Sequence, residues 1–118
     1  MKPVIKKALN KIRNGEAIIL FDLDGTICDT TENKYAFAVP DENMIKVVNL
    51  LKQMGNKITV YTSRGSSSGI DYTGLIKQQL EKWGVQYDDL KQKPSADLIV
   101  DDMAVTPEDF FSLVDEIW

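Results

Sequence analysis

The stretch Ala17-Ile18-Ile19-Leu20-Phe21-Asp22-Leu23-Asp24-Gly25-Thr26 decides the fold, because it joins an unbroken apolar run to two carboxylates and a glycine. An apolar run without alternation predicts a strand buried on both faces, as in a parallel sheet covered by helices. Asp22 and Asp24 lie two positions apart, so in extended chain they share one side of the strand, just before Gly25 allows a turn. Two such carboxylates repel each other, and the pair therefore calls for a cation, a shared proton or both.

The rest of the chain alternates between helix and strand patterns. Helical spacing and end signals predict helices over residues 3–13, 41–54 and 72–83, and from 107 onward. Apolar and β-branched runs predict strands over residues 57–61, about 85–87 and 96–100. Residues 29–40 are expected to form a flap beside the carboxylates, and residues 91–94 a basic turn. This order predicts a single α/β domain over residues 1–118, with a three-layer, Rossmann-like parallel sheet, helices on both faces and an N-terminal helical extension over residues 1–16.

Polar residues follow three of the predicted buried strands. In a parallel sheet flanked by helices, functional side chains gather outside the carboxyl ends of the strands. We therefore expect one site at that edge, built from Asp22, Asp24, Thr62, Asp101 and Asp102.

Composition limits the chemistry that this site can perform. The chain of 118 residues has a net charge of −4 and a sequence pI of about 4.8, which argues against broad nucleic-acid binding. It contains no histidine, which excludes Ser-His and Cys-His nucleophiles and histidine metal sites. Cys28 is the only cysteine, so no intrachain disulfide can form, and no apolar run approaches the ~18 residues of a membrane span. We therefore expect a soluble, cytoplasmic protein with no membrane association.

Two other readings of the acidic motif conflict with its spacing and order. A calcium-binding EF-hand loop needs glycine at its sixth position and glutamate at its twelfth, whereas here glycine is fourth and the twelfth residue is Asn33. A two-component receiver domain places its lysine after its acidic pair and its central aspartate, whereas here Lys93 precedes Asp101 and Asp102.

The combination of motifs resembles the haloacid dehalogenase superfamily of phosphatases. Its first motif, an apolar strand running into Asp-x-Asp-Gly-Thr, matches Phe21 to Thr26. The later motifs match in order a hydroxyl residue at the end of the next strand, a lysine, and an acidic pair after an apolar strand: Thr62, Lys93 and Asp101-Asp102. The resemblance covers residues 17 to about 111 and leaves the N-terminal helix outside it.

The resemblance implies a Mg²⁺-dependent phosphatase that works through an aspartyl-phosphate. It implies that Asp22 is the nucleophile, that Asp24 exchanges protons with the leaving group and with water, and that Thr62 and Lys93 are also catalytic and bind the phosphoryl oxygens. Mg²⁺ would be held by Asp22, by the backbone carbonyl of Asp24 and by the acidic pair, with Asp102 favoured over Asp101 as the direct ligand. Ser63 is a further candidate phosphate ligand. Arg64 either binds the substrate phosphate or another anionic group, or is a loop charge.

The spacing of the motifs bears on the substrate. The 39 residues between Asp22 and Thr62, and the 30 between Thr62 and Lys93, leave no room for the cap domain that many superfamily members insert. The open site is similar to that of small capless members associated with bacterial polysaccharide synthesis, although Gln92 stands where glycine is expected before Lys93. This implies a small phosphorylated substrate such as a sugar phosphate, and a second subunit as one way to roof the site. A non-catalytic module that binds a phosphorylated partner and a phosphotransferase remain as alternatives.

Overall fold

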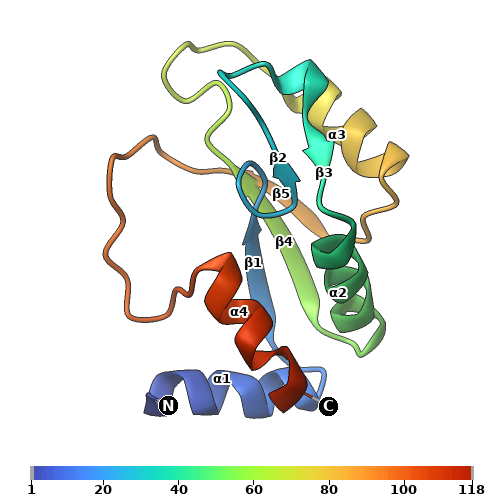
Figure 1. Ribbon diagram of the computed structural model, residues 1–118, viewed down its shortest axis with the longest axis vertical. Helices are drawn as coiled ribbons and strands as arrows, with labels where there is room; N and C mark the ends of the chain where they lie inside the picture. Colours follow the sequence, from blue (N-terminus) through green and yellow to red (C-terminus); the bar gives the residue numbers. More distant parts are fainter. Residues whose placement is uncertain (1, 118) are drawn as a thin grey trace.

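The centre of the molecule is a parallel sheet of three strands, built around the apolar run quoted above. We analysed a computed structural model, which describes residues 2–117. Strand β1 (Ile18–Asp22) pairs with β4 (Lys57–Thr62), which pairs in turn with β5 (Asp89–Gln92) (Figure 1). The register places Asp22 beside Tyr61 and Thr62 beside Gln92, so the carboxyl ends of all three strands lie at one edge.

A short hairpin lies beyond the carboxyl end of β1. It consists of the antiparallel strands β2 (Cys28–Asp29) and β3 (Val39–Pro40), joined through the 3-10 turn η1 (Tyr35–Phe37). We call residues 29–40 the flap. Its presence beside the strand-end carboxylates confirms the flap that the sequence predicts.

The four predicted helices are present, and they begin and end where local signals place them. They are α1 (Pro3–Arg13), α2 (Glu42–Gln53), α3 (Thr73–Lys82) and α4 (Pro107–Leu113), the last followed by the 3-10 turn η2 (Val114–Glu116). Asp41 caps α2 by accepting the N–H of Met44, and Thr106 caps α4 by accepting the N–H of Asp109. None of the helices in residues 2–117 is long and apolar enough to cross a membrane.

The helix α1 is part of the core and not a separate extension. Its Leu9 and Ile12 are buried in the same apolar cluster as Phe21 of β1. The buried side chain of Asn56, just before β4, accepts the N–H of Ala17 at 3.0 Å and donates to the carbonyl of Ile12 at 3.1 Å. This amide therefore links the end of α1, the start of β1 and the turn after α2.

The sheet differs from the predicted one on one face of β1. Ile18 and Leu20 are 68% and 58% exposed, whereas Phe21 is buried and contacts Phe110 of α4 edge to face. Since side chains alternate along a strand, one face of β1 is packed and the other is open. The prediction that β1 is buried on both faces is therefore wrong.

Two of the predicted strands are also wrong. The strand expected at residues 85–87 lies instead at Asp89–Gln92, and it takes in part of the expected basic turn. Asp88 determines this position, because its carboxylate accepts the N–H of Ile58 at 2.8 Å and holds the chain against β4.

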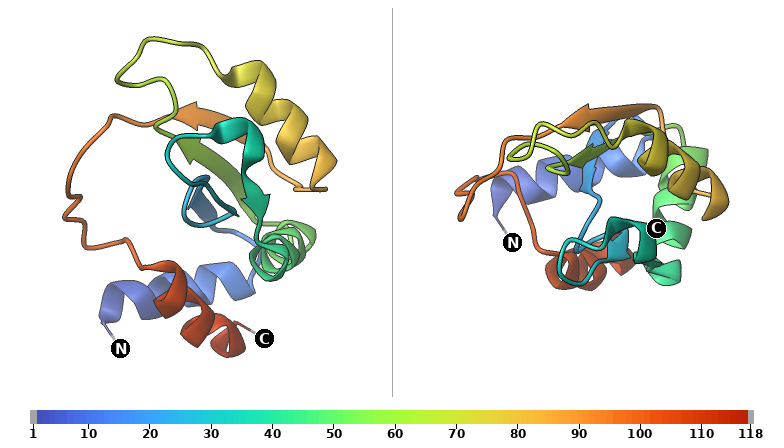
Figure 2. Two further views of the ribbon diagram at one scale, coloured as in Figure 1. Left: turned by 45° about the horizontal axis from the view of Figure 1, so that its top comes forward. Right: turned by 90° about the horizontal axis from the view of Figure 1, so that it is seen from above.

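Residues 96–100 form no strand at all. Leu98, Ile99 and Val100 are 79%, 58% and 90% exposed, in a segment that arches away from β1 before α4 begins (Figures 1 and 2). Among residues 2–117, β1 pairs with no strand other than β4, so its other edge is unpaired.

Candidate active site

An ion pair at the carboxyl ends of the strands joins two of the predicted catalytic residues. Lys93 Nζ lies 3.3 Å from Asp22 Oδ1, and both side chains are largely buried. The backbone N–H of Lys93 donates to the carbonyl of Thr62. This hydrogen bond fixes the backbone of Lys93 beside the end of β4. The side chain then lies over the ring of Tyr61, with Nζ 4.7 Å from the ring centroid. The register of β4 and β5 thus brings Lys93 across the middle strand to Asp22.

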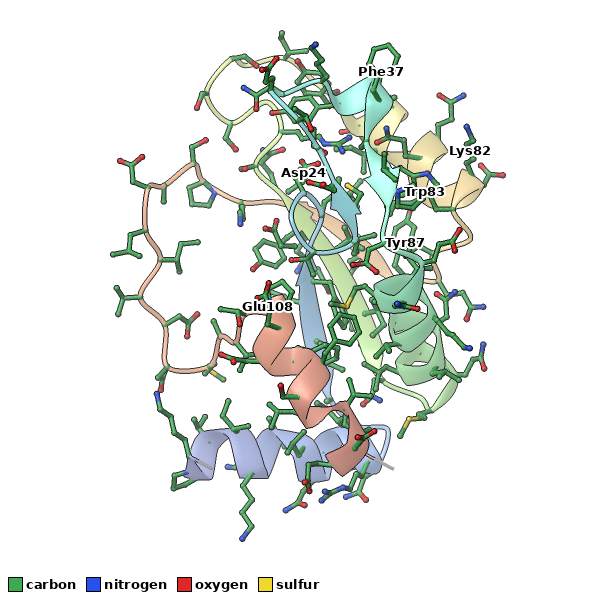
Figure 3. The ribbon with its side chains drawn as sticks, in the orientation of Figure 1. Asp24, Phe37, Lys82, Trp83, Tyr87 and Glu108 are labelled. Carbon is green, nitrogen blue, oxygen red and sulfur yellow. The ribbon has the colours of Figure 1, made fainter. Side chains whose placement is uncertain are left out.

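The second carboxylate, Asp24, lies in the turn beyond β1 and is held by hydrogen bonds (Figure 3). Arg64 donates from Nε to Asp24 Oδ2 at 2.9 Å and from Nη2 to Oδ1 at 2.8 Å. Thr30 of the flap donates its hydroxyl to Oδ1 at 2.5 Å, and the Cys28 thiol approaches the same oxygen at 3.4 Å. Donors from three parts of the chain therefore fix the orientation of this carboxylate.

The two carboxylates differ in the direction of their pKa shifts. Burial raises the pKa of Asp22, and the charge and hydrogen bond of Lys93 offset that rise only in part. Burial also opposes ionisation of Asp24, but the hydrogen bonds from Arg64 and Thr30 and the charge of Arg64 bring its pKa below the ordinary value. The environments thus shift the pKa values of two acids of the same kind in opposite directions.

Arg64 is not placed to bind substrate phosphate. Its side chain has no solvent exposure, and the nitrogen that does not contact Asp24, Nη1, donates to Gln79 Oε1 at 2.7 Å. The guanidinium carbon also lies 4.6 Å from the centroid of the Tyr35 ring. The phosphate-binding prediction for Arg64 is therefore wrong, and so is the alternative of an ordinary loop charge, because the loop after β4 turns this side chain inward to Asp24.

The two hydroxyl residues at the end of β4 differ in position. Thr62 is buried, and its hydroxyl oxygen accepts the N–H of Arg64 at 3.1 Å, which leaves its own hydrogen free to be donated. Ser63 is exposed at the start of the loop. The carbonyl of Ser63 accepts the N–H of Ser66, so Ser63 begins a turn at the rim of the site.

The acidic pair Asp101-Asp102 is not brought to the strand ends. Both residues are exposed in the segment that arches away from β1, and Asp101 accepts the N–H of Met103 in a local turn. Residues 2–117 contain no group of three or more His, Cys, Asp or Glu side chains that could hold a metal ion. The carboxylates of Asp22 and Asp24 are already paired with Lys93 and Arg64. In this arrangement the residues predicted to bind Mg²⁺ do not form a site for it.

Five contributors to the site were not predicted from the sequence: Cys28, Thr30, Tyr35, Tyr61 and Gln79. Gln79 carries the clearest signal, because it lies on the buried face of α3 between Ile76 and Leu80. A polar residue on an apolar helix face needs a partner, and Gln79 has two, Arg64 and the carbonyl of Tyr35, to which its Nε2 donates at 2.6 Å. Thr30 lies in the predicted flap, but nothing in its neighbourhood in the sequence points to Asp24.

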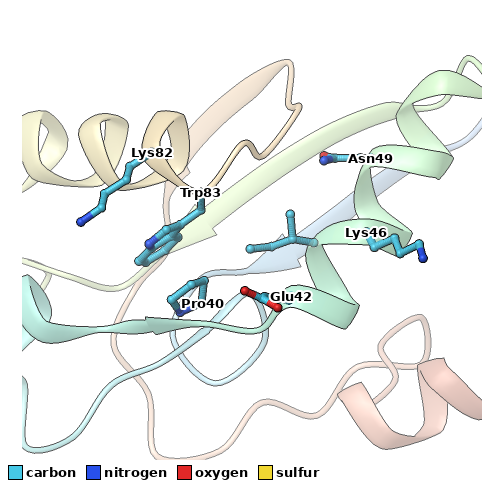
Figure 4. A pocket seen from close by; sticks show the side chains of 7 residues that line it. Pro40, Glu42, Lys46, Asn49, Lys82 and Trp83 are labelled. Atoms are coloured by element: carbon cyan, nitrogen blue, oxygen red, sulfur yellow. The ribbon is translucent and has the colours of Figure 1, made fainter.

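A surface hollow lies elsewhere, between α2 and the C-terminal end of α3 (Figure 4). It is lined by Pro40, Glu42, Ile45, Lys46, Asn49, Lys82 and Trp83. None of the predicted site residues belongs to it. The amide of Asn49 is already engaged, with the carbonyl of Gly84 and the N–H of Gln86. The hollow and the carboxylate site therefore lie in different parts of the surface. We base the functional interpretation on the carboxylates.

Comparison with known proteins supports the fold. The chain resembles a crystal structure of a structural-genomics target from Vibrio cholerae, with a TM-score of 0.75 and 24% sequence identity over 86% of this chain and 95% of the other. No protein-family model matches the chain, and no curated protein matches it. The fold is thus that of a small α/β protein with a parallel sheet flanked by helices, Rossmann-like in its arrangement.

Proposed function

We propose that the protein is a phosphomonoester hydrolase in which Asp22 is the nucleophile, as in the haloacid dehalogenase superfamily, without a cap domain. The observation that carries the proposal is the contact of 3.3 Å between Lys93 and Asp22 at the carboxyl ends of the strands. A cation beside a nucleophilic carboxylate both draws in a phosphate dianion and stabilises the charge that develops on its oxygens. Asp24, fixed two residues further on, supplies a second carboxylate within the same turn.

The reaction divides into two displacements at phosphorus. In the first, an oxygen of Asp22 forms a bond to phosphorus while the ester bond breaks and the alcohol oxygen leaves. In the second, water attacks the aspartyl-phosphate, its proton passes to a base, and the bond between phosphorus and Asp22 breaks to release phosphate. Asp24 is suited to be that base, because the contacts with Arg64 and Thr30 keep it ionised.

The leaving oxygen needs a proton, and an ionised Asp24 does not hold one until it has accepted it from water. A substrate whose leaving group is stable as an anion avoids this requirement. We therefore expect p-nitrophenyl phosphate, which releases p-nitrophenolate, to be cleaved more readily than an alkyl phosphate. The open strand ends suit a small molecule, and a sugar phosphate is the natural substrate that we propose. For this substrate, the proton that Asp24 accepts from water in the second displacement is the one that it returns to the leaving oxygen of the next substrate molecule.

The proposal includes Mg²⁺ because the predicted ligands are carboxylates. Carboxylate oxygens are the ligands that Mg²⁺ prefers, but Asp101 and Asp102 lie in the exposed segment. A metal site at Asp22 therefore requires residues 96–102 to approach the open edge of β1. The apolar side chains of residues 98–100, and those of Ile18 and Leu20, would both lose exposure in that approach.

The test is hydrolysis of p-nitrophenyl phosphate by the wild-type protein and by Asp22→Asn, with Mg²⁺ present. We expect the variant to lose activity, because an amide is not a nucleophile at phosphorus, and equal activity in the two proteins would refute the proposal. Separate measurement of p-nitrophenol and of inorganic phosphate distinguishes hydrolysis from transfer to a second substrate. A wild-type protein that binds phosphate but releases no p-nitrophenol would instead be a binding module.

A further inference from the structure

We propose that Arg64 is a positioning residue, which fixes the Asp24 carboxylate and connects it to the flap. The proposal rests on the proposed function for its kinetic consequences and on the contacts of Arg64 for its geometry. A planar guanidinium that donates two parallel hydrogen bonds to one carboxylate restrains both its position and its rotation.

The contacts of Arg64 are arranged as a chain that reaches the flap. Nη1 donates to Gln79 on α3, and Gln79 donates in turn to the carbonyl of Tyr35. The Tyr35 ring lies under the guanidinium and meets Tyr72 edge to face, with ring centroids 5.0 Å apart. Thr30, at the other end of the flap, donates directly to Asp24. Contacts with α3 and the flap therefore fix the Arg64 side chain, and Arg64 in turn fixes the Asp24 carboxylate.

The burial of this group indicates that it acts on Asp24 and not on substrate. The Arg64 side chain is fully shielded from solvent, whereas Asp24 retains 29% exposure and faces the strand ends. A substrate can reach Asp24 but not the guanidinium behind it. Loss of Arg64 should thus change the rate of the chemical step and leave substrate binding alone.

Kinetics of Arg64→Lys and Arg64→Met test this prediction. Lysine keeps the charge but cannot make two parallel hydrogen bonds, so we expect kcat to fall about tenfold in Arg64→Lys. In Arg64→Met we expect a fall of about 10²- to 10³-fold, within the range of about 10²- to 10⁴-fold ascribed to a positioned acid–base group. KM should change by less than about twofold, since Arg64 makes no contact that binds the substrate equally in the ground state and the transition state. Arg13→Lys, at an exposed arginine that pairs with Glu116, is the matched control and should leave both constants unchanged.

A second readout is independent of phosphatase activity. Cys28 is the only cysteine, is buried, and lies 3.8 Å from Arg64 Nη2, and burial followed by the charge of Asp24 raises the pKa of its thiol to about 12. Its alkylation by iodoacetamide should be slow in the wild-type protein and in Arg13→Lys. Loss of the Arg64 charge by itself raises the thiol pKa further and slows alkylation, so a faster reaction reports greater exposure of Cys28. We expect alkylation to be faster in Arg64→Met, because the flap is then no longer held through Gln79 and Tyr35, and Arg64→Lys should restore part of the protection.

The outcomes separate this proposal from the proposed function. Unchanged kcat in a folded Arg64→Met, or a rise in KM that matches the loss of kcat/KM, would overturn the positioning role. If the wild-type protein shows no phosphatase activity, the proposed function fails, and the alkylation rates then decide alone. Equal rates in wild type, Arg64→Lys and Arg64→Met would overturn the proposal. Should Arg64→Met fail to fold, Arg64→Lys and Gln79→Met, which removes the Nη1 acceptor, provide the same comparison.

Discussion

Lys93 Nζ contacts Asp22 Oδ1 across the intervening strand β4: the candidate nucleophile ends β1 and its cation directly follows β5, and these two strands are not neighbours in the sheet. The aromatic ring of Tyr61, on β4, supports the lysine along the way. This geometry follows from the short strand β5 and from the N–H of Lys93, which donates to the carbonyl of Thr62.

Removal of Lys93 should therefore lower activity far more than removal of a nearby lysine. In Lys93→Ala we expect kcat/KM for p-nitrophenyl phosphate to fall about 10²- to 10³-fold, as when one preorganised donor is lost from an active site. Lys91→Ala is the matched control, because Lys91 is an exposed lysine of β5, two residues before Lys93. Steady-state kinetics of both variants measure the difference. A similar loss in the two would show that Lys93 acts only through net charge.

The two carboxylates should affect stability with opposite signs as pH changes. Since the pKa of Asp24 is lowered on folding, its stabilising effect is present above the unfolded value of about 3.9 and is lost as pH falls through the folded pKa. The pKa of Asp22 is raised on folding, so its protonated form is favoured and stability falls as pH rises from the unfolded to the folded pKa.

Thermal unfolding of Asp22→Asn and Asp24→Asn from pH 3 to pH 8, with a chelator present, measures this difference. At pH 7 we expect Asp22→Asn to be more stable than the wild type. Asp24→Asn should be less stable by about 3 kcal/mol, because Arg64 is left buried without its anion. Both differences should shrink toward pH 3. Destabilisation of the same sign in both variants at pH 7 would contradict the assignment.

Mg²⁺ should change the segment that carries the acidic pair. If the ion binds at Asp22 together with Asp101 or Asp102, residues 98–100 must come to the open edge of β1, and their backbone N–H groups should then exchange more slowly with solvent. Hydrogen exchange with and without Mg²⁺ measures this. Asp102→Asn should abolish the protection, and Asp97→Asn, at an exposed acid of the same segment, should leave it intact. Exchange rates that do not respond to Mg²⁺ would remove the ion from the proposal.

Asn56→Ala should destabilise the protein although Asn56 lies far from the strand-end site. The carbonyls of Ile12 and Leu51 keep other donors, but the N–H of Ala17 loses its acceptor inside the core. A buried donor without a partner costs about 2 kcal/mol. Urea unfolding followed by tryptophan fluorescence measures the loss. Asn49→Ala is the control, because water can replace its more exposed hydrogen bonds. A loss in Asn49→Ala as large as that in Asn56→Ala would contradict this explanation.

The helices and the strands β1 and β4 could be predicted from the sequence because their signals are local. Asp41 and Thr106 cap helices through hydrogen bonds three residues away, and the apolar residues of α2 follow helical spacing. β5 was misplaced because it is short and polar, and because its position depends on Asp88, which contacts a strand 30 residues earlier in the chain. Residues 96–100 have the composition of a buried strand, but composition does not specify a pairing partner.

The candidate site was predictable to a similar extent. The strand-end rule brings Asp22, Asp24 and Thr62 together without any knowledge of their side-chain contacts. Lys93 was expected there only from the family resemblance, and Asp101 and Asp102, which the rule also assigns to the site, lie in the exposed segment. The role of Arg64 was not predictable, because the direction in which the loop after β4 turns is set by Gln79 and Tyr35, residues 15 and 29 positions away. A polar residue on a buried helix face, such as Gln79, is the one local sign that such a cluster exists.

The amide of Asn56 joins the end of the first helix to the first strand, and this has a consequence for how the chain unfolds. The buried side chains of α1 and the hydrogen bond of Ala17 cannot be released separately, so α1 should not fray away from the sheet as an independent appendage. We expect the N-terminal helix and the central sheet to open in a single cooperative transition. A protease that attacks the turn at Gly15 should then cut only as fast as the whole domain unfolds.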